Sequence, residues 1–104
     1  MTKPGRQVEN APKNQKELFK AVLKLKNMEE CEAFFEDLCT PQELKTLADR
    51  WRVAKLLVKG VPYRDIYDHT GVSTATITRV ARSMSLGAGG YRVMLQREGH
   101  LEDK

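Results

Sequence analysis

The sequence lacks the long apolar segments that mark membrane and secreted proteins. No run of 18 apolar residues occurs, so we expect no membrane-spanning helix. No apolar stretch follows the basic residues near Met1, so we expect no secretory signal peptide and a cytoplasmic location. Aromatic residues make up only 7% of the 104 residues, and a chain of this length is one small domain that buries only part of its surface.

Cysteine and histidine are scarce, with two residues of each. Cys31 and Cys39 fall in one expected helix, about 12 Å apart at a rise of ~1.5 Å per residue, which is too far for a disulfide. Neither has a second cysteine or a histidine at metal-ligand spacing, because His69 and His100 lie far along the chain. No nucleophile–base pair and no phosphate-binding loop occurs. We therefore expect no metal site, no cofactor and no enzyme activity.

Carboxylates are absent from residues 69–97, although four arginines fall there. Residues 61–97 contain five arginines and two aspartates, a net charge of +3 within a chain whose net charge is +4. A basic stretch without carboxylates suits a surface that faces phosphate groups. Chance variation in a short chain is the alternative explanation.

Apolar residues recur at helical spacing from about Gln15 onward, and no segment alternates as a β-strand does. Residues 1–14 contain two prolines, a glycine and two asparagines, which predicts a disordered arm. The spacing predicts an all-α domain over residues 15–97 and a flexible acidic tail over 98–104. After the first helix, the expected helices cover about 29–39, 41–59, 62–69, 74–84 and 91–97.

The third of these helices has the clearest start. Thr40 suits an N-cap, Pro41 suits the first helical position, and Glu43 completes a capping box. Gly60 suits the end of the helix, since it tolerates a left-handed backbone. The expected apolar stripe consists of Leu44, Leu47, Ala48, Trp51, Ala54, Leu57 and Val58.

Residues 62–84 match the pattern of a helix-turn-helix motif. Pro62 opens a short helix that buries mainly Ile66. Gly71 then allows a backbone with positive φ, and Val72 offers an apolar side chain to the core. Ser73 suits the N-cap of the next helix. A short helix, a tight glycine turn and a capped second helix are typical of DNA-binding proteins.

The face of the second helix opposite Ile77 and Val80 carries short polar and basic side chains. Threonine methyl groups and alanine suit contact with thymine, and arginine suits guanine or phosphate. An ordinary solvated helix is the alternative. The candidate DNA-binding residues in this segment are Ser73, Thr74, Ala75, Thr76, Thr78, Arg79 and Arg82.

Residues 40–83 resemble the Trp-repressor superfamily, and within it the chain is similar to the bacterial YerC/YecD group. The resemblance rests on Thr40-Pro41, Arg50-Trp51-Arg52, Gly60 and the run Ala75-Thr76-Ile77-Thr78-Arg79. It implies six helices in an intertwined homodimer, with the first three helices and the last sharing one core across both subunits. It also implies that Arg64 reaches a base, that Arg79 lies near phosphate, and that the residues lining the major groove are Thr74, Ala75, Thr76 and Thr78.

The effector site of that family is only partly matched. Arg50 and Arg79 match two arginines that flank the bound indole, and Ser83 matches a further pocket residue, so these three are candidate effector-binding residues. Val80 replaces a glycine that leaves room for the indole, and Asp37 and Cys39 replace two pocket leucines. Filling such a space costs about 1–3 kcal/mol, so we expect that L-tryptophan is not the co-repressor. Arg50 and Arg79 could instead serve phosphate contacts or ion pairs with Asp49 or Asp37.

These features favour a homodimeric, sequence-specific DNA-binding transcriptional repressor whose partner is double-stranded DNA at a palindromic operator. A small-molecule effector, if there is one, is unidentified. A DNA-binding module of replication or chromosome organisation is one alternative. A protein-interaction module that has lost DNA binding is another.

Overall fold

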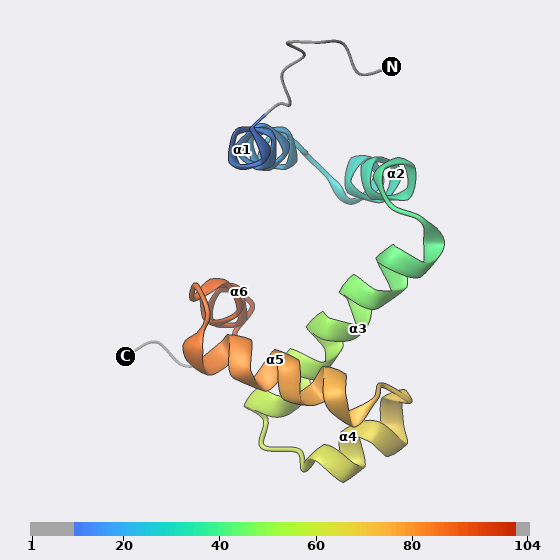
Figure 1. The fold of residues 1–104 in the computed structure, drawn as a ribbon, viewed down its shortest axis with the longest axis vertical. Helices are drawn as coiled ribbons and strands as arrows, with labels where there is room; N and C mark the ends of the chain where they lie inside the picture. The colour runs from blue at the N-terminus through green and yellow to red at the C-terminus, as the bar shows by residue number, and fades with distance from the viewer. Residues whose placement is uncertain (1–9, 102–104) are drawn as a thin grey trace, which may run out of the picture. The chain divides into compact units, whose positions relative to one another are not determined.

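The computed structural model describes residues 10–101, which form six α-helices and no β-strand. This confirms the expected all-α fold. No helix within these residues is long and apolar enough to cross a membrane. The helices form two compact units: one ends at Cys39 and contains the first two helices, and the other begins at Thr40. Figure 1 labels α1 (Ala11–Val22), α2 (Met28–Leu38), α3 (Pro41–Val58), α4 (Tyr63–Thr70), α5 (Thr74–Leu86) and α6 (Gly90–Arg97).

Helix α1 begins at Ala11, four residues before the expected start. The side chain of Asn10 accepts a hydrogen bond from the backbone N–H of Lys13 at 3.3 Å, and Pro12 lies in the first turn, where its missing N–H is not needed. The prediction of a disordered arm is therefore wrong for residues 11–14. The remainder of that expected arm, residues 1–9, lies outside the described part of the chain.

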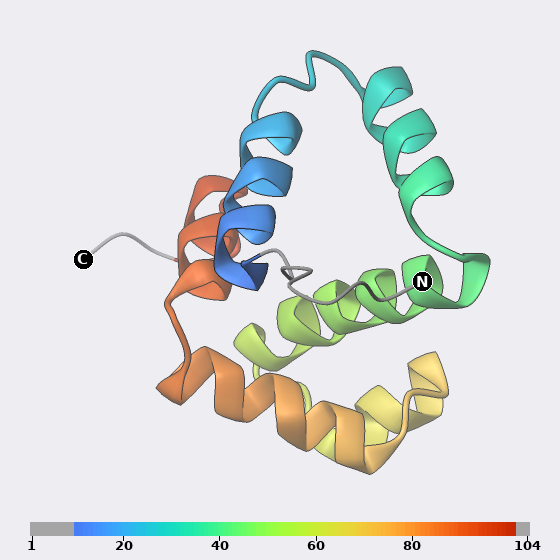
Figure 2. The ribbon, with the colours of Figure 1, turned by 45° about the horizontal axis from the view of Figure 1, so that its top comes forward.

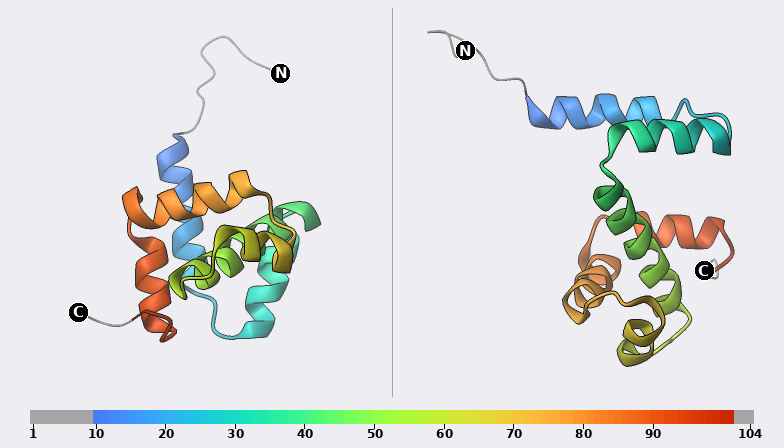
Figure 3. Two further views of the ribbon diagram at one scale, coloured as in Figure 1. Left: turned by 90° about the horizontal axis from the view of Figure 1, so that it is seen from below. Right: turned by 90° about the vertical axis from the view of Figure 1, so that its right-hand side faces the viewer.

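Helices α1 and α2 bury no side chain completely. The two helices run in opposite directions (Figure 3). Their apolar side chains face solvent to an unusual degree: Phe19 is 59% exposed, Leu23 84% and Met28 71%. The predicted helical periodicity is present in this unit, but its apolar stripes are only partly covered: Leu18, Val22, Phe34 and Phe35 are half-buried.

The second unit is built around α5, which packs against α3, α4 and α6 (Figure 2). Seven buried side chains from three helices and one turn form its core, and fully burying one aliphatic side chain stabilises a fold by about 1.5–3 kcal/mol. The core residues are Val53, Ala54, Leu56, Ile66, Val72, Ile77 and Val80.

Helix α3 presents two apolar faces rather than the single predicted stripe. Val53 and Leu56, which lie outside that stripe, are buried, whereas Leu47 in the stripe is 45% exposed. The reason is that α5 crosses the C-terminal half of α3 and leaves the N-terminal half uncovered within this unit (Figure 1). The predicted capping box is present, with Thr40 Oγ1 accepting from the Glu43 N–H at 3.1 Å and Glu43 Oε1 from the Thr40 N–H at 2.8 Å.

The last two helices follow the prediction closely. Helix α5 extends two residues beyond its expected end, and α6 begins one residue before its expected start. The residues directly after α6 are hydrogen-bonded to the helix: the His100 N–H donates to the Leu95 carbonyl at 2.8 Å. This differs from the flexible tail expected from residue 98, of which residues 102–104 lie outside the described structure.

Candidate nucleic-acid interface

The turn between α4 and α5 is held by three short hydrogen bonds. The Gly71 N–H donates to the Tyr67 carbonyl at 2.8 Å, with Gly71 at φ +73°. Thr70 Oγ1 donates to the Ile66 carbonyl at 2.7 Å and accepts from the Val72 N–H at 3.0 Å. Val72 is also buried in the core, so both hydrogen bonds and apolar packing fix the turn between α4 and α5.

Ser73 starts α5 as an N-cap. Its hydroxyl oxygen accepts from the Thr76 N–H at 3.2 Å and its hydroxyl donates to Thr76 Oγ1 at 3.1 Å. Thr76 is accordingly half-buried, whereas Ser73 remains exposed. These contacts confirm the helix-turn-helix motif, which Figure 3 shows as the adjoining α4 and α5.

One face of α5 is fully available to a partner within this unit. It lies opposite Ile77 and Val80, which are 0% and 1% exposed. Arg64 on α4 is also exposed. The exposed candidate residues of α5 are Thr74, Ala75, Thr78, Arg79 and Arg82.

The guanidinium groups of this surface carry no intramolecular counter-charge in the described residues. Ion pairs there join Lys45 Nζ to Asp49 Oδ2 at 2.7 Å and His100 Nε2 to Glu98 Oε1 at 3.1 Å, and neither involves an arginine. Arg64, Arg79 and Arg82 are therefore free to pair with an external anion.

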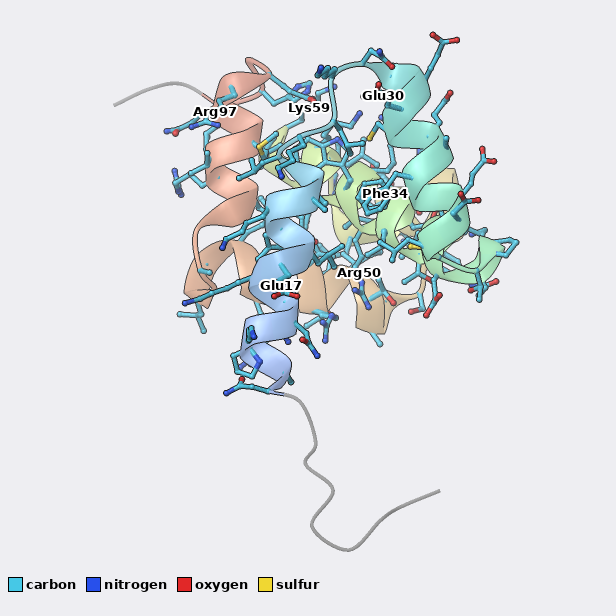
Figure 4. The ribbon with its side chains drawn as sticks, turned by 90° about the horizontal axis from the view of Figure 1, so that it is seen from above. Glu17, Glu30, Phe34, Arg50, Lys59 and Arg97 are labelled. Carbon is cyan, nitrogen blue, oxygen red and sulfur yellow. The ribbon has the colours of Figure 1, made fainter. Side chains whose placement is uncertain are left out.

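The three candidate effector-binding residues have different surroundings in the described part of the chain. Arg79 is exposed beside Val80, whose side chain fills space in the core. Arg50, labelled on α3 in Figure 4, is half-buried, and its Nε is buried without a hydrogen-bond partner among residues 10–101. Asp49, one of its suggested partners, pairs with Lys45 instead.

Ser83 lines a groove of about 510 Å³ beside the corner between α5 and α6. The walls are mainly apolar and include Trp51 on α3 and Tyr91 on α6, whose rings are nearly parallel. Neither Arg50 nor Arg79 lines this groove. Helical periodicity predicts that Trp51 lies in an apolar stripe, but no sequence signal connects Trp51 with Tyr91. The groove is completed by Gly87, Ala88, Gly90 and Met94.

The described residues offer no candidate metal site. No group of three histidine, cysteine, aspartate or glutamate side chains there lies close enough to hold a metal ion. Cys31 and Cys39 are half-buried free thiols.

A family model, described as Trp repressor protein, matches residues 13–99. The chain belongs to the Trp repressor family. It is 47% identical over 81 residues to the uncharacterized protein YerC of Bacillus subtilis (strain 168), and the match covers 78% of each chain. This relative agrees with the resemblance to the YerC/YecD group.

Solved structures of the family have the same fold. The chain is similar to a candidate Trp repressor from Staphylococcus aureus, with a TM-score of 0.81 and 43% identity over 86% of this chain and 90% of that one. It is also similar to a TrpR-like protein from Eubacterium eligens, with a TM-score of 0.79 and 46% identity over 85% of this chain and 91% of that one.

Proposed function

We propose that this member of the Trp repressor family is a sequence-specific DNA-binding transcriptional repressor that acts on double-stranded DNA in the cytoplasm. The observation that carries the proposal is the exposed face of α5. It presents threonines, an alanine and arginines without a carboxylate, on a helix whose angle to α4 is held by the hydrogen-bonded turn. A helix with these properties fits the major groove.

The residues divide by the kind of contact they are suited to make. Thr74, Ala75 and Thr78 have short side chains that reach base edges, together with Thr76 at the start of the helix and Arg64 from α4. Arg79 and Arg82 bind phosphate oxygens through their guanidinium groups, and Ser73 does so through its backbone N–H, because its hydroxyl already donates to Thr76 Oγ1. These contacts position the protein without reading sequence.

The protein acts as a homodimer. A second subunit would cover the exposed apolar side chains of α1 and α2 and the uncovered face of α3 at Leu47. Two identical motifs related by a twofold axis then meet DNA about one helical turn, ~34 Å, apart, so the operator is palindromic. The functional domain in this proposal extends from α1 to the end of α6.

Tryptophan is not the effector in this proposal, because Val80 fills core space at the position where the family accommodates an indole. Arg50 keeps a buried Nε that has no hydrogen-bond acceptor among residues 10–101. Buried donors of this kind are normally satisfied. An anionic group of an unidentified effector or of the second subunit would satisfy it.

The proposal can be tested by in vitro selection of duplex DNA from a random pool. The selection is run with and without candidate metabolites. We expect enrichment of one palindromic sequence and salt-dependent affinity for it. Absence of any salt-dependent affinity for DNA would instead support a protein-interaction module. The protein could also bind duplex DNA selectively in vitro but occupy few promoters in a chromatin-immunoprecipitation map. That result would support a role in replication or chromosome organisation.

A further inference from the structure

Helix α4 is held in the core of the second unit by a single buried side chain. Ile66 is 0% exposed, and it is the one buried residue among the eight of α4. Apolar packing is non-directional, so one such contact fixes the position of a helix more firmly than its orientation. The orientation of α4 relative to α5 therefore depends on the turn that joins them, residues 71–73.

The hydroxyl of Thr70 connects α4 to this turn. Its oxygen donates to the Ile66 carbonyl at 2.7 Å and accepts from the Val72 N–H at 3.0 Å, and it thereby links two buried residues. Among residues 10–101, this is the hydrogen bond that the Val72 N–H makes. Hydrogen bonds weaken steeply when their angles are distorted. The hydroxyl therefore adds a directional restraint that the apolar contact of Ile66 does not supply.

The groups proposed to contact DNA tolerate a change of helix orientation unequally. Thr74, Ala75 and Thr78 have short side chains, so a shift of the α5 backbone displaces their contacting atoms by the same amount. Arg79 and Arg82 are exposed and have long side chains that can change rotamer to follow a phosphate oxygen. A change in the angle between α4 and α5 therefore weakens base contacts before it weakens phosphate contacts.

We propose that Thr70 is a positioning residue for sequence recognition. Its hydroxyl holds α4 and α5 at the angle at which Arg64 and the short side chains of α5 reach base edges together. This inference rests on the proposed function and adds to it a residue that makes no contact with DNA. Thr70 is half-buried, and its hydroxyl is already bonded to two backbone groups, so it acts through the orientation of α5.

The test is Thr70→Val, which removes the hydroxyl and keeps a branched side chain of similar shape. We expect about tenfold lower affinity for the selected duplex, the value of one displaced base contact. Affinity for random duplex changes by less than about twofold, because phosphate contacts carry it. Thr70→Ser restores both affinities, since serine supplies the same donor and acceptor.

Thr46 provides the matched control. Its hydroxyl also donates to a carbonyl four residues back, that of Gln42, at 3.0 Å, and the residue is likewise half-buried. It lies within α3, however, and its other hydrogen bond is to the Gln42 side chain, so it bridges no turn. Thr46→Val leaves the ratio of specific to random affinity at its wild-type value.

Amide hydrogen exchange gives a second readout that needs no DNA. We expect the Val72 N–H to exchange faster in Thr70→Val and at the wild-type rate in Thr70→Ser and Thr46→Val. The Val53 N–H in α3 keeps its wild-type rate in all three variants, because only the turn opens locally. A merely structural role of Thr70 would instead accelerate exchange at both amides.

Three results overturn the inference alone when the wild-type chain binds the selected duplex. They are an unchanged specificity ratio in Thr70→Val, an equal loss of affinity for both duplexes, and a loss in Thr70→Ser as large as that in Thr70→Val. If Thr70→Val does not fold, Thr70→Ala removes the same hydroxyl with less bulk and gives the same comparison. If the wild-type chain binds no duplex, the proposed function fails together with the inference.

Discussion

Trp51 on α3 and Tyr91 on α6 stack with their ring planes 5° apart and their centroids 6.4 Å apart. The contact attaches the last helix to the helix that supports the helix-turn-helix motif, and it forms a wall of the groove beside Ser83. The position of α6 therefore depends on an aromatic pair whose members are 40 residues apart in the chain, at positions 51 and 91.

Replacing Tyr91 with alanine removes this stack. We expect Tyr91→Ala to lower the free energy of unfolding by about 1–2 kcal/mol, combining the aromatic pair with the loss of partly buried area. Tyr91→Phe keeps the ring and should change stability by less than about 0.5 kcal/mol. Urea unfolding followed by the fluorescence of Trp51, the only tryptophan, measures both variants. Equal stabilities of the alanine and phenylalanine variants would show that the stack contributes nothing.

Gly87 ends α5 at a point where no side chain fits. A Cβ atom built on Gly87 would collide with the backbone carbonyl oxygen of Ser83, which accepts the hydrogen bond from the Gly87 N–H. We expect Gly87→Ala to destabilise the fold by about 1–3 kcal/mol. Gly90→Ala is the control, because a Cβ there meets nothing within 4 Å. Thermal unfolding of the two variants compares them, and a similar melting temperature for both would contradict the expectation.

Base contacts and phosphate contacts can be separated by mutation. Arg64→Ala and Thr78→Ala should change which bases are preferred, at about 1–3 kcal/mol for a well-placed base contact. Arg82→Ala should weaken binding to all sequences. Affinities for the selected duplex and for single-base variants of it, measured at one salt concentration, test the division. Equal losses on specific and random DNA for all three variants would show that it is wrong.

The exposed apolar stripe of α1 predicts the dimer interface. Phe19→Glu and Leu23→Glu should each weaken self-association by at least about tenfold, because burying one such side chain stabilises by about 1.5–3 kcal/mol. Lys20→Glu on the same helix changes charge without removing apolar surface and serves as the control. Sedimentation equilibrium at micromolar concentration measures the constants. A folded, stable wild-type monomer under these conditions would rule out the dimer.

Calorimetry with L-tryptophan tests whether the effector site of the family survives. We expect a dissociation constant in the millimolar range or weaker, because Val80 is buried in the core where an indole would need space and Asp37 replaces an apolar wall. DNA affinity should not change when L-tryptophan is added. Micromolar binding that also tightens DNA binding would show that the pocket is intact.

Much of the candidate site followed from local signals. Gly71 with its positive φ, the Ser73 N-cap and the capping box of Thr40 and Glu43 each act within a few residues, and each has the expected geometry. The start of α1 is also a local feature, because Asn10 and Pro12 are ordinary helix-start residues, although the predicted start lies four residues later. The resemblance implies that Thr76 lines the major groove with its neighbours, whereas in the structure it bonds to Ser73 and is half-buried.

Caps, glycine turns and periodicity depend on neighbours in the chain, so the sequence alone predicts which side of α5 is apolar and, apart from the start of α1, the helix ends to within about two residues. The tertiary structure decided which apolar face of α3 is buried. It also decided that Val53 and Leu56 join the core, that Tyr91 stacks on Trp51, and that Arg50 keeps a buried Nε without a partner among the described residues. These outcomes depend on which helices meet, and helix periodicity is the same whichever neighbour covers a face.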